Sequence, residues 1–80
     1  MTSTHKIRIG RRSLDVQIAS FDRHHRSITW RIEYEREFNE HGRLICCGFF
    51  EPRLEKIVRE DGALIEAALW EIIDRKESEQ

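Results

Sequence analysis

The alternation of apolar and polar residues in the stretch SITWRIEYE is the feature that most constrains the fold of this chain. Ile28, Trp30, Ile32 and Tyr34 stand at every second position of that stretch. A period of two puts these side chains on one face of a β-strand, and aromatic and β-branched residues favour strands. The pattern therefore predicts a long strand over residues 27–38 that turns its charged side chains to the outer face.

Two shorter alternating runs precede this strand, and one apolar run follows it. They predict strands near residues 5–9, 14–21 and 43–50, separated by the sequences GRRS, DRHHR and NEHG. Each of these three sequences has the length of a hairpin loop. The last run is apolar on both faces, which is typical of a strand that is covered on both sides. We therefore expect a four-stranded antiparallel meander.

After Pro52 the apolar residues recur at every third or fourth position, which is the period of a helix. Proline is favoured in the first helical turn, because the N–H that it lacks has no helical partner there. The spacing predicts a helical region over residues 52–76. Asp61 and Gly62 interrupt it, since Gly is unfavourable inside a helix and Asp is a good N-cap. We expect one long or kinked helix, or two helices that meet at this dipeptide, packed on one face of the sheet.

These elements predict one small α+β domain spanning residues 1–80. No apolar run approaches the roughly 18 residues that a membrane span requires. The N-terminal sequence also lacks the apolar core of a signal peptide. We therefore expect a cytoplasmic protein that does not contact a membrane and whose two cysteines are free thiols.

Two adjacent cysteines and two adjacent histidines raise the question of a metal or redox site. Cys46 and Cys47 cannot hold one ion together on a regular strand, because neighbouring side chains point to opposite faces. The hairpin loop with His24 and His25 lies about 30 Å from them along the strand. We therefore expect no metal and no cofactor. If the NEHG loop has four residues, Cys47 lies opposite Tyr34 in the core, and a one-residue change in loop length would exchange the two cysteines.

Cys46 and His41 are the one pair that suggests catalysis, because a cysteine nucleophile needs a base beside it. Neither residue stands at a predicted helix N-terminus, where a thiol would be activated. The sequence contains no phosphate-binding loop, no dinucleotide-binding fingerprint and no nucleophile elbow. We therefore expect a protein that is not an enzyme, and a small cysteine-dependent enzyme is the second alternative.

The net charge of −1 hides an uneven distribution of charge along the chain. Residues 1–31 carry seven basic and two acidic groups, whereas residues 32–80 carry seven basic and thirteen acidic groups. Acidic residues at alternate positions of one strand would form a row in which neighbouring carboxylates are about 6.6 Å apart. Such a row can imitate a phosphate backbone. This row predicts a surface for a basic partner protein, formed by Glu33, Glu35, Glu37 and Glu40.

A basic cluster at the opposite end of the sheet gives the first alternative, a nucleic-acid-binding regulatory protein. Such proteins owe most of their affinity to contacts between basic side chains and phosphates. The sequence pI of about 6.4 is far below that of a typical nucleic-acid-binding domain. The residues that would contact nucleic acid are Lys6, Arg23, Arg26 and Arg31.

The helical segment and the fourth strand contain more apolar residues than one small sheet can cover. Surplus apolar surface is typical of an interface, and a two-fold homodimer is the simplest arrangement. A cysteine on the outer face could also cross-link two copies by oxidation. The residues predicted for the dimer interface are Leu44, Cys46, Phe50, Leu64, Trp70 and Ile73.

Together, these features favour a small non-enzymatic protein-binding module. We expect a homodimeric regulator or inhibitor that acts on another protein or protein complex. Compact, acidic chains of this size without catalytic motifs are often regulators, adaptors or inhibitors, including those that phages and mobile elements encode to act on a host protein complex. No motif in the sequence is specific enough to indicate a family.

Overall fold

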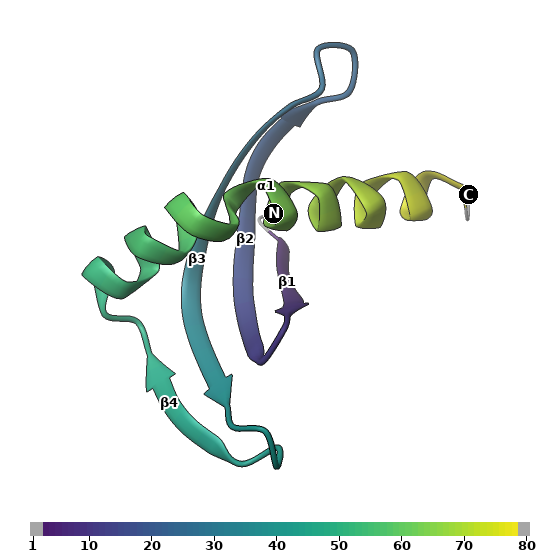
Figure 1. Cartoon of the computed structure of the whole chain (residues 1–80). Coiled ribbons are helices and arrows are strands. Elements are labelled where there is room, and N and C mark those ends of the chain that lie inside the picture. The colour runs from purple at the N-terminus through teal and green to yellow at the C-terminus, as the bar shows by residue number, and fades with distance from the viewer. Residues whose placement is uncertain (1–2, 79–80) are drawn as a thin grey trace.

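The computed structural model describes residues 3–78 and confirms the α+β fold, with a four-stranded sheet followed by one helix (Figure 1). The sheet is antiparallel with the strand order β1-β2-β3-β4. The helix runs across the strands on one face of the sheet (Figure 1). The elements are β1 (Ser3–Ile9), β2 (Arg12–Asp22), β3 (Ser27–Phe38), β4 (Leu44–Gly48) and α1 (Glu51–Ser78).

The first two hairpins are closed by short turns that fix the register of the sheet. Gly10, with a φ of 59°, begins a two-residue turn between the paired residues Ile9 and Arg12. Glycine suits this position because it adopts positive φ without strain. In the loop between β2 and β3, the Asp22 carboxylate accepts hydrogen bonds from two backbone N–H groups, and Arg26 adopts a φ of 51°. Both turns therefore support the predicted meander.

A β-bulge interrupts the pairing of β2 with β3 and changes the faces of the residues that follow it. Asp15 pairs with Tyr34, but Val16 pairs with Ile32, so Glu33 is an extra residue in β3. An extra residue reverses the alternation of side chains along the remainder of the strand. The bulge therefore exchanges the inner and outer faces of β3 beyond residue 33.

This exchange corrects the orientation that continuous alternation predicted for the end of β3. Tyr34 lies on the outer face, where the guanidinium of Arg36 stacks over its ring at 4.6 Å. Glu35 pairs with Leu14 and is buried on the helix side, with only 1% of its surface exposed. The prediction that these carboxylates form a row on the outer face is therefore wrong, because Glu35 faces the helix.

The core lies between the sheet and α1, as the two periodicities predicted. The buried helical residues recur at intervals of four or eight, so they form one stripe that faces the sheet. Burying a Leu or Ile side chain completely contributes about 1.5–3 kcal/mol, so this stripe supplies much of the stability. The core cluster consists of Ile7, Leu14, Val16, Ile32, Ile57, Ile65 and Leu69.

The helix continues without a break through Asp61 and Gly62. Of the predicted alternatives, the structure therefore has one long helix and not two helices. Ile57 and Ile65 are both buried in the same core on either side of this dipeptide. Arg12 of β2 also forms an ion pair with Asp61 at 3.4 Å. Tertiary packing on both sides therefore outweighs the low helix propensity of the two residues. No helix in the described part of the chain is long and apolar enough to cross a membrane.

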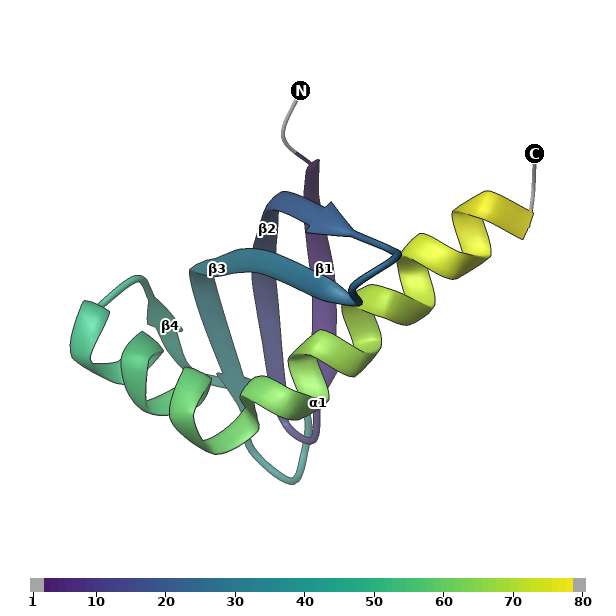
Figure 2. The same cartoon turned by 90° about the horizontal axis from the view of Figure 1, so that it is seen from above.

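The end of the β2–β3 hairpin curves to the side of the sheet that carries α1 (Figure 1 and Figure 2), and its side chains contact the C-terminal half of the helix. The Phe21 ring packs edge to face against Trp70, with 6.0 Å between the ring centroids. The Arg26 guanidinium lies 4.0 Å from the centroid of the same indole ring and pairs with Asp74 at 3.4 Å. These contacts hold the C-terminal half of α1 against the hairpin.

The continuous helix predicts that Gly62→Ala will stabilise the protein. A Cβ at this position meets no atom within 4 Å, and alanine loses less backbone entropy in a helix than glycine. The free energy of unfolding, measured in urea, should rise by about 0.5–1 kcal/mol. Gly10→Ala is the control and should destabilise, because its positive φ strains any side chain. A neutral or destabilising Gly62→Ala would contradict a continuous helix.

Candidate functional site

β4 is short and pairs with only the last part of β3. Its register runs from Glu35 opposite Gly48 to Phe38 opposite Leu44. Gly48 has a φ of 150°, which L residues rarely adopt, and the chain leaves the sheet at this glycine. Among the described residues, no strand lies beside residues 27–34 of β3 on the side away from β2. We call this stretch the open edge of β3.

The register shows which backbone groups of β3 face the open edge. Ile9 and Arg12 close a two-residue turn and are therefore a hydrogen-bonded pair. Hydrogen-bonded and non-hydrogen-bonded pairs alternate along antiparallel strands, so the backbone of Arg31 is directed at β2. The N–H and C=O groups of Trp30 and Ile32 are then directed away from β2. Within the described residues, neither takes part in a backbone hydrogen bond other than those of strand pairing.

A groove of about 800 Å³ lies between this part of β3 and the first turns of α1. Apolar side chains from three segments form part of its lining, and charged side chains form the remainder. We call it the β3–α1 groove. It is lined by Trp30, Arg31, Ile32, Glu33, Phe49, Glu51, Leu54, Glu55, Val58 and Arg59.

Large apolar side chains are also exposed on the segment that joins β3 to α1. Four of the seven exposed large hydrophobic residues in the described chain lie within residues 44–50, with 52–72% of their surface exposed. Phe49 is the most exposed of them. We call this set the exposed apolar segment. It consists of Leu44, Ile45, Phe49 and Phe50.

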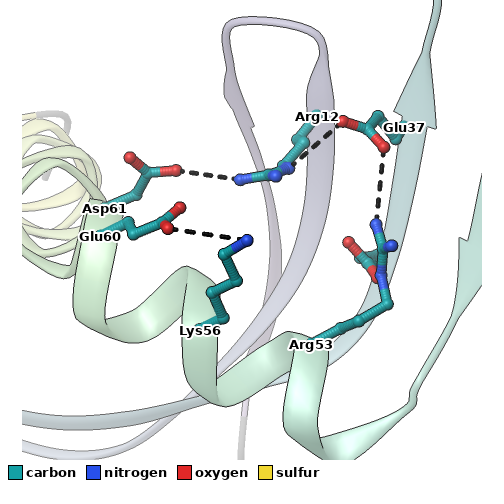
Figure 3. Close-up of polar contacts among 7 residues, drawn as sticks. Arg12, Glu37, Arg53, Lys56, Glu60 and Asp61 are labelled. Carbon is teal, nitrogen blue, oxygen red and sulfur yellow. Dashed lines mark hydrogen bonds and ion pairs between the residues drawn. The ribbon is translucent and has the colours of Figure 1, made fainter.

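A chain of ion pairs connects the start of α1 to β2 and β3 (Figure 3). Arg53 of α1 donates to the buried carboxylate of Glu35 and lies 3.5 Å from Glu37. Glu37 in turn lies 3.7 Å from Arg12, which pairs with Asp61. The hydrogen bond from Arg53 to Glu35 raises the pKa of Arg53, and the negative charge of Glu35 adds to this effect. The first turn of α1 is therefore held above the point where β4 ends.

The sequence did not predict that Arg53 and Glu35 would pair, but it contains one signal of such a pair. Arg53 stands four residues before Ile57, so both lie on the helix face that packs against the sheet. A cation on an otherwise apolar stripe needs a buried partner of opposite charge. The sequence gives no comparable signal for Glu35, because the bulge that turns it inward falls within a run of strand-forming residues.

The acidic residues predicted for a binding surface do not form one row. Glu33 is exposed at the bulge and lines the β3–α1 groove, whereas Glu40 is exposed in the β3–β4 loop. Glu35 is buried, and Glu37 is half-buried and paired with Arg12 and Arg53. A row of carboxylates that imitates phosphates is therefore not a feature of this sheet.

The basic residues predicted for nucleic-acid binding are spread over different surfaces. Lys6 and Arg31 are exposed on the sheet, and Arg31 donates to the side chain of Gln17 at 3.1 Å. Arg23 lies over the Phe21 ring, 5.3 Å from its centroid. Arg26 is held by Trp70 and Asp74 on α1, as described above. Of the basic side chains at the hairpin end, that of Arg26 therefore faces the helix.

The predicted dimer-interface residues differ widely in exposure. Leu44 and Phe50 are exposed within the exposed apolar segment, whereas Leu64 is exposed on α1. Cys46 and Trp70 are half-buried, and Ile73 is buried against the sheet. An interface between two copies would therefore have to use the first three residues, and the homodimer stays a prediction.

The two cysteines exchange the positions that were expected for them. Cys47 lies opposite Arg36 and is exposed, whereas Cys46 lies opposite Glu37 and is half-buried. Cys47 lies opposite Arg36 instead of Tyr34, but these two residues share one face of β3, and the bulge at Glu33 turns that face outward. The thiol of Cys47 raises the pKa of Tyr34 through a hydrogen bond. An intermolecular disulfide, if one forms, would use Cys47.

The histidines lie at separate places in the fold. His24 and His25 lie in the β2–β3 loop, and a hydrogen bond with His25 lowers the pKa of Asp22. His41 lies in the β3–β4 loop, 3.5 Å from the Glu40 carboxylate. Within residues 3–78, no three His, Cys, Asp or Glu side chains gather closely enough to hold a metal ion.

No protein-family model matches this chain, and neither a curated protein nor a solved structure is found to be similar to it. The functional argument therefore depends on the geometry of the open edge, the groove and the exposed apolar segment.

The pairing of Arg53 with Glu35 predicts that Arg53→Ala will be strongly destabilising. The substitution leaves a carboxylate that is 99% buried without its cation. Removing one partner of a buried pair costs about 3–5 kcal/mol, and we expect about 3 kcal/mol because the Arg53 side chain is 42% exposed. Urea unfolding measures this loss. The double variant Glu35→Leu with Arg53→Leu is the control and should recover most of the stability, because it removes both charges. A loss of less than about 1 kcal/mol for Arg53→Ala alone would contradict the pairing.

Half-buried His5 on the helix side of β1 predicts a pH dependence of stability. Burial, together with the charge of Lys76, lowers the pKa of His5 below 6.5 in the folded state. The unfolded chain therefore takes up the proton first, so the free energy of unfolding should fall as the pH decreases from about 7 to about 5. His5→Gln should remove this part of the pH dependence in urea titrations. His41→Gln is the control and should retain it, and equal slopes for wild type and His5→Gln would contradict the assignment.

Proposed function

We propose that this chain is a small non-enzymatic module that binds another protein and acts on it as a regulator or inhibitor. The observation that supports this proposal is the exposed apolar segment. Leu44, Ile45, Phe49 and Phe50 place four large apolar side chains in water within seven residues. Complete burial of such a side chain contributes about 1.5–3 kcal/mol, and leaving more than half of each residue exposed forgoes a large part of it. Exposed apolar patches mark interaction sites.

The position of this segment strengthens the proposal. It lies on an edge strand and on the connection to the helix, away from the core cluster that holds the sheet and α1 together. Its side chains therefore add little to the fold. Phenylalanine is among the residues enriched at protein–protein interfaces, so Phe49 and Phe50 are suitable anchors for a partner.

The other two functions considered have less support. The basic residues needed for a nucleic-acid-binding surface are directed at different parts of the fold, because Arg26 pairs with Asp74 on the helix and Arg31 donates to Gln17 on the sheet. For a cysteine-dependent enzyme, Cys47 is the exposed thiol, and it lies beside Tyr34 and opposite Arg36. Of the candidate pair, Cys46 has a half-buried thiol on the helix side, whereas the His41 imidazole is exposed in the loop and pairs with Glu40.

The proposal predicts that polar substitutions in the exposed apolar segment abolish partner binding without unfolding the protein. The immobilised chain would be used to capture proteins from a lysate of the cells that express it. Ile45→Ser combined with Phe50→Ser should reduce specific capture at least about tenfold, which corresponds to a loss of about 1.4 kcal/mol. The melting temperature should change little, because both side chains are exposed.

Leu64→Ser is the matched control, since Leu64 is equally exposed but lies on α1 outside the segment. This variant should capture the same proteins as the wild type. Capture that is unchanged by Ile45→Ser with Phe50→Ser would contradict the proposed binding surface. Loss of capture in all variants, Leu64→Ser included, would also contradict it, because no single surface would then be responsible.

A further inference from the structure

We propose that the β3–α1 groove binds an extended basic segment of a partner protein, which joins the sheet as a strand beside the open edge of β3. This inference deepens the proposed function, because it specifies the conformation and chemistry of the partner. It depends on a different surface from the exposed apolar segment, with only Phe49 in common. The two proposals can therefore fail separately.

The backbone of β3 supplies the first part of the argument. The open edge spans eight residues, or about 26 Å of extended chain. Trp30 and Ile32 direct their N–H and C=O groups to this edge, where they can pair with a further strand. An added strand would continue the line of β4, which leaves the sheet at Gly48. Addition of an extended segment to an exposed edge is a common form of peptide recognition.

The side chains of the groove supply the second part. Trp30 and Ile32 form the sheet side of the groove, and Leu54 and Val58 form the helix side. Every second residue of an added strand points to the same face. A segment with apolar residues at alternate positions would therefore place them between β3 and α1. The volume of about 800 Å³ is large enough for several such side chains.

The charges at the groove indicate the sign of the partner. Glu33, Glu51 and Glu55 line it, and none of the three forms an ion pair with another described residue. Of the two arginines in the lining, Arg31 is drawn towards β2 by its hydrogen bond to Gln17. With Arg59 as the second arginine, three carboxylates and two guanidinium groups line the groove. The excess of negative charge would be complemented by Lys or Arg residues in the added strand.

A second copy of this chain fits the open edge less well than a single extended segment. The N-terminal half of α1 extends past β3 on the side of β4 (Figure 1). If two copies paired through their open edges around a two-fold axis, the N-terminal half of α1 from each copy would occupy the same space above the two paired β3 strands. A lone strand has no helix to place there. The occupant that we infer is therefore a peptide segment of a different protein.

A displayed library of random peptides of about eight residues, selected against the intact chain, tests this inference. Enriched peptides should have apolar residues at alternate positions with Lys or Arg between them. In NMR spectra of the complex, the strongest binder should slow amide exchange at Trp30 and Ile32. It should also show cross-strand contacts with β3.

Two variants distinguish the groove from other surfaces. Val58→Glu places a charge in the groove and should weaken binding of that peptide at least tenfold. Leu64→Glu makes the same type of change on the exposed side of α1 and should leave the affinity within about twofold of wild type. Glu55→Lys should weaken binding of basic peptides and less so of neutral ones, because it reverses one charge of the lining.

Three results would overturn the inference: no enriched peptide, a peptide unaffected by Val58→Glu, or a peptide bound as a helix. A fourth would be a dimer in solution whose Trp30 and Ile32 amides are protected without any peptide, since a second copy would then occupy the edge. If the peptide test fails while the Ile45→Ser and Phe50→Ser variant still loses capture, the proposed function stands and only the groove inference is lost.

Discussion

The ion pair between Arg53 and the buried carboxylate of Glu35 is the interaction on which the arrangement of this fold depends. Glu35 faces the helix because a bulge at Glu33 reverses the alternation of β3. Since a buried carboxylate without a cation is costly, the first turn of α1 is held where Arg53 can reach it. The same position lies opposite Gly48, where β4 leaves the sheet. One bulge thus turns Glu35 towards the helix, so the first turn of α1 packs beside the point where β4 leaves the sheet.

The functional surfaces follow from the same geometry. Because β4 ends opposite Glu35, the earlier part of β3 has a strand on one side only, and α1 forms a wall above it. The chain that connects β4 to α1 is left exposed, with Phe49 and Phe50 in water. Edge strands are commonly protected against unwanted pairing by charges and bulges, and Arg31 and Glu33 provide both at this edge. The overhanging helix restricts access further, which favours a narrow extended partner over a second folded domain.

The elements of the fold could be predicted from the sequence, because periods of two and of three to four residues are local properties. The strand and helix boundaries agree to within a few residues, and the meander order follows from hairpin-length turns. The faces of Tyr34, Glu35 and the two cysteines could not be predicted, because a bulge between strand-forming residues leaves no pattern. The continuity of α1 through Gly62 depends on burial of Ile57 and Ile65 on either side. Such long-range packing outweighs local propensity and is not encoded in any short stretch.

Residue-resolved amide hydrogen exchange in the protein without a partner tests the central claim most directly, because it reports which backbone groups of β3 are paired. The account predicts an alternating pattern, in which Thr29 and Arg31 are protected by β2 while Trp30 and Ile32 exchange much faster. Glu35 and Glu37, whose backbone groups are directed at β4, should be protected again. Slow exchange at Trp30 and Ile32, equal to that at Thr29 and Arg31, would contradict an open edge. The groove would then have no free backbone groups to offer a partner.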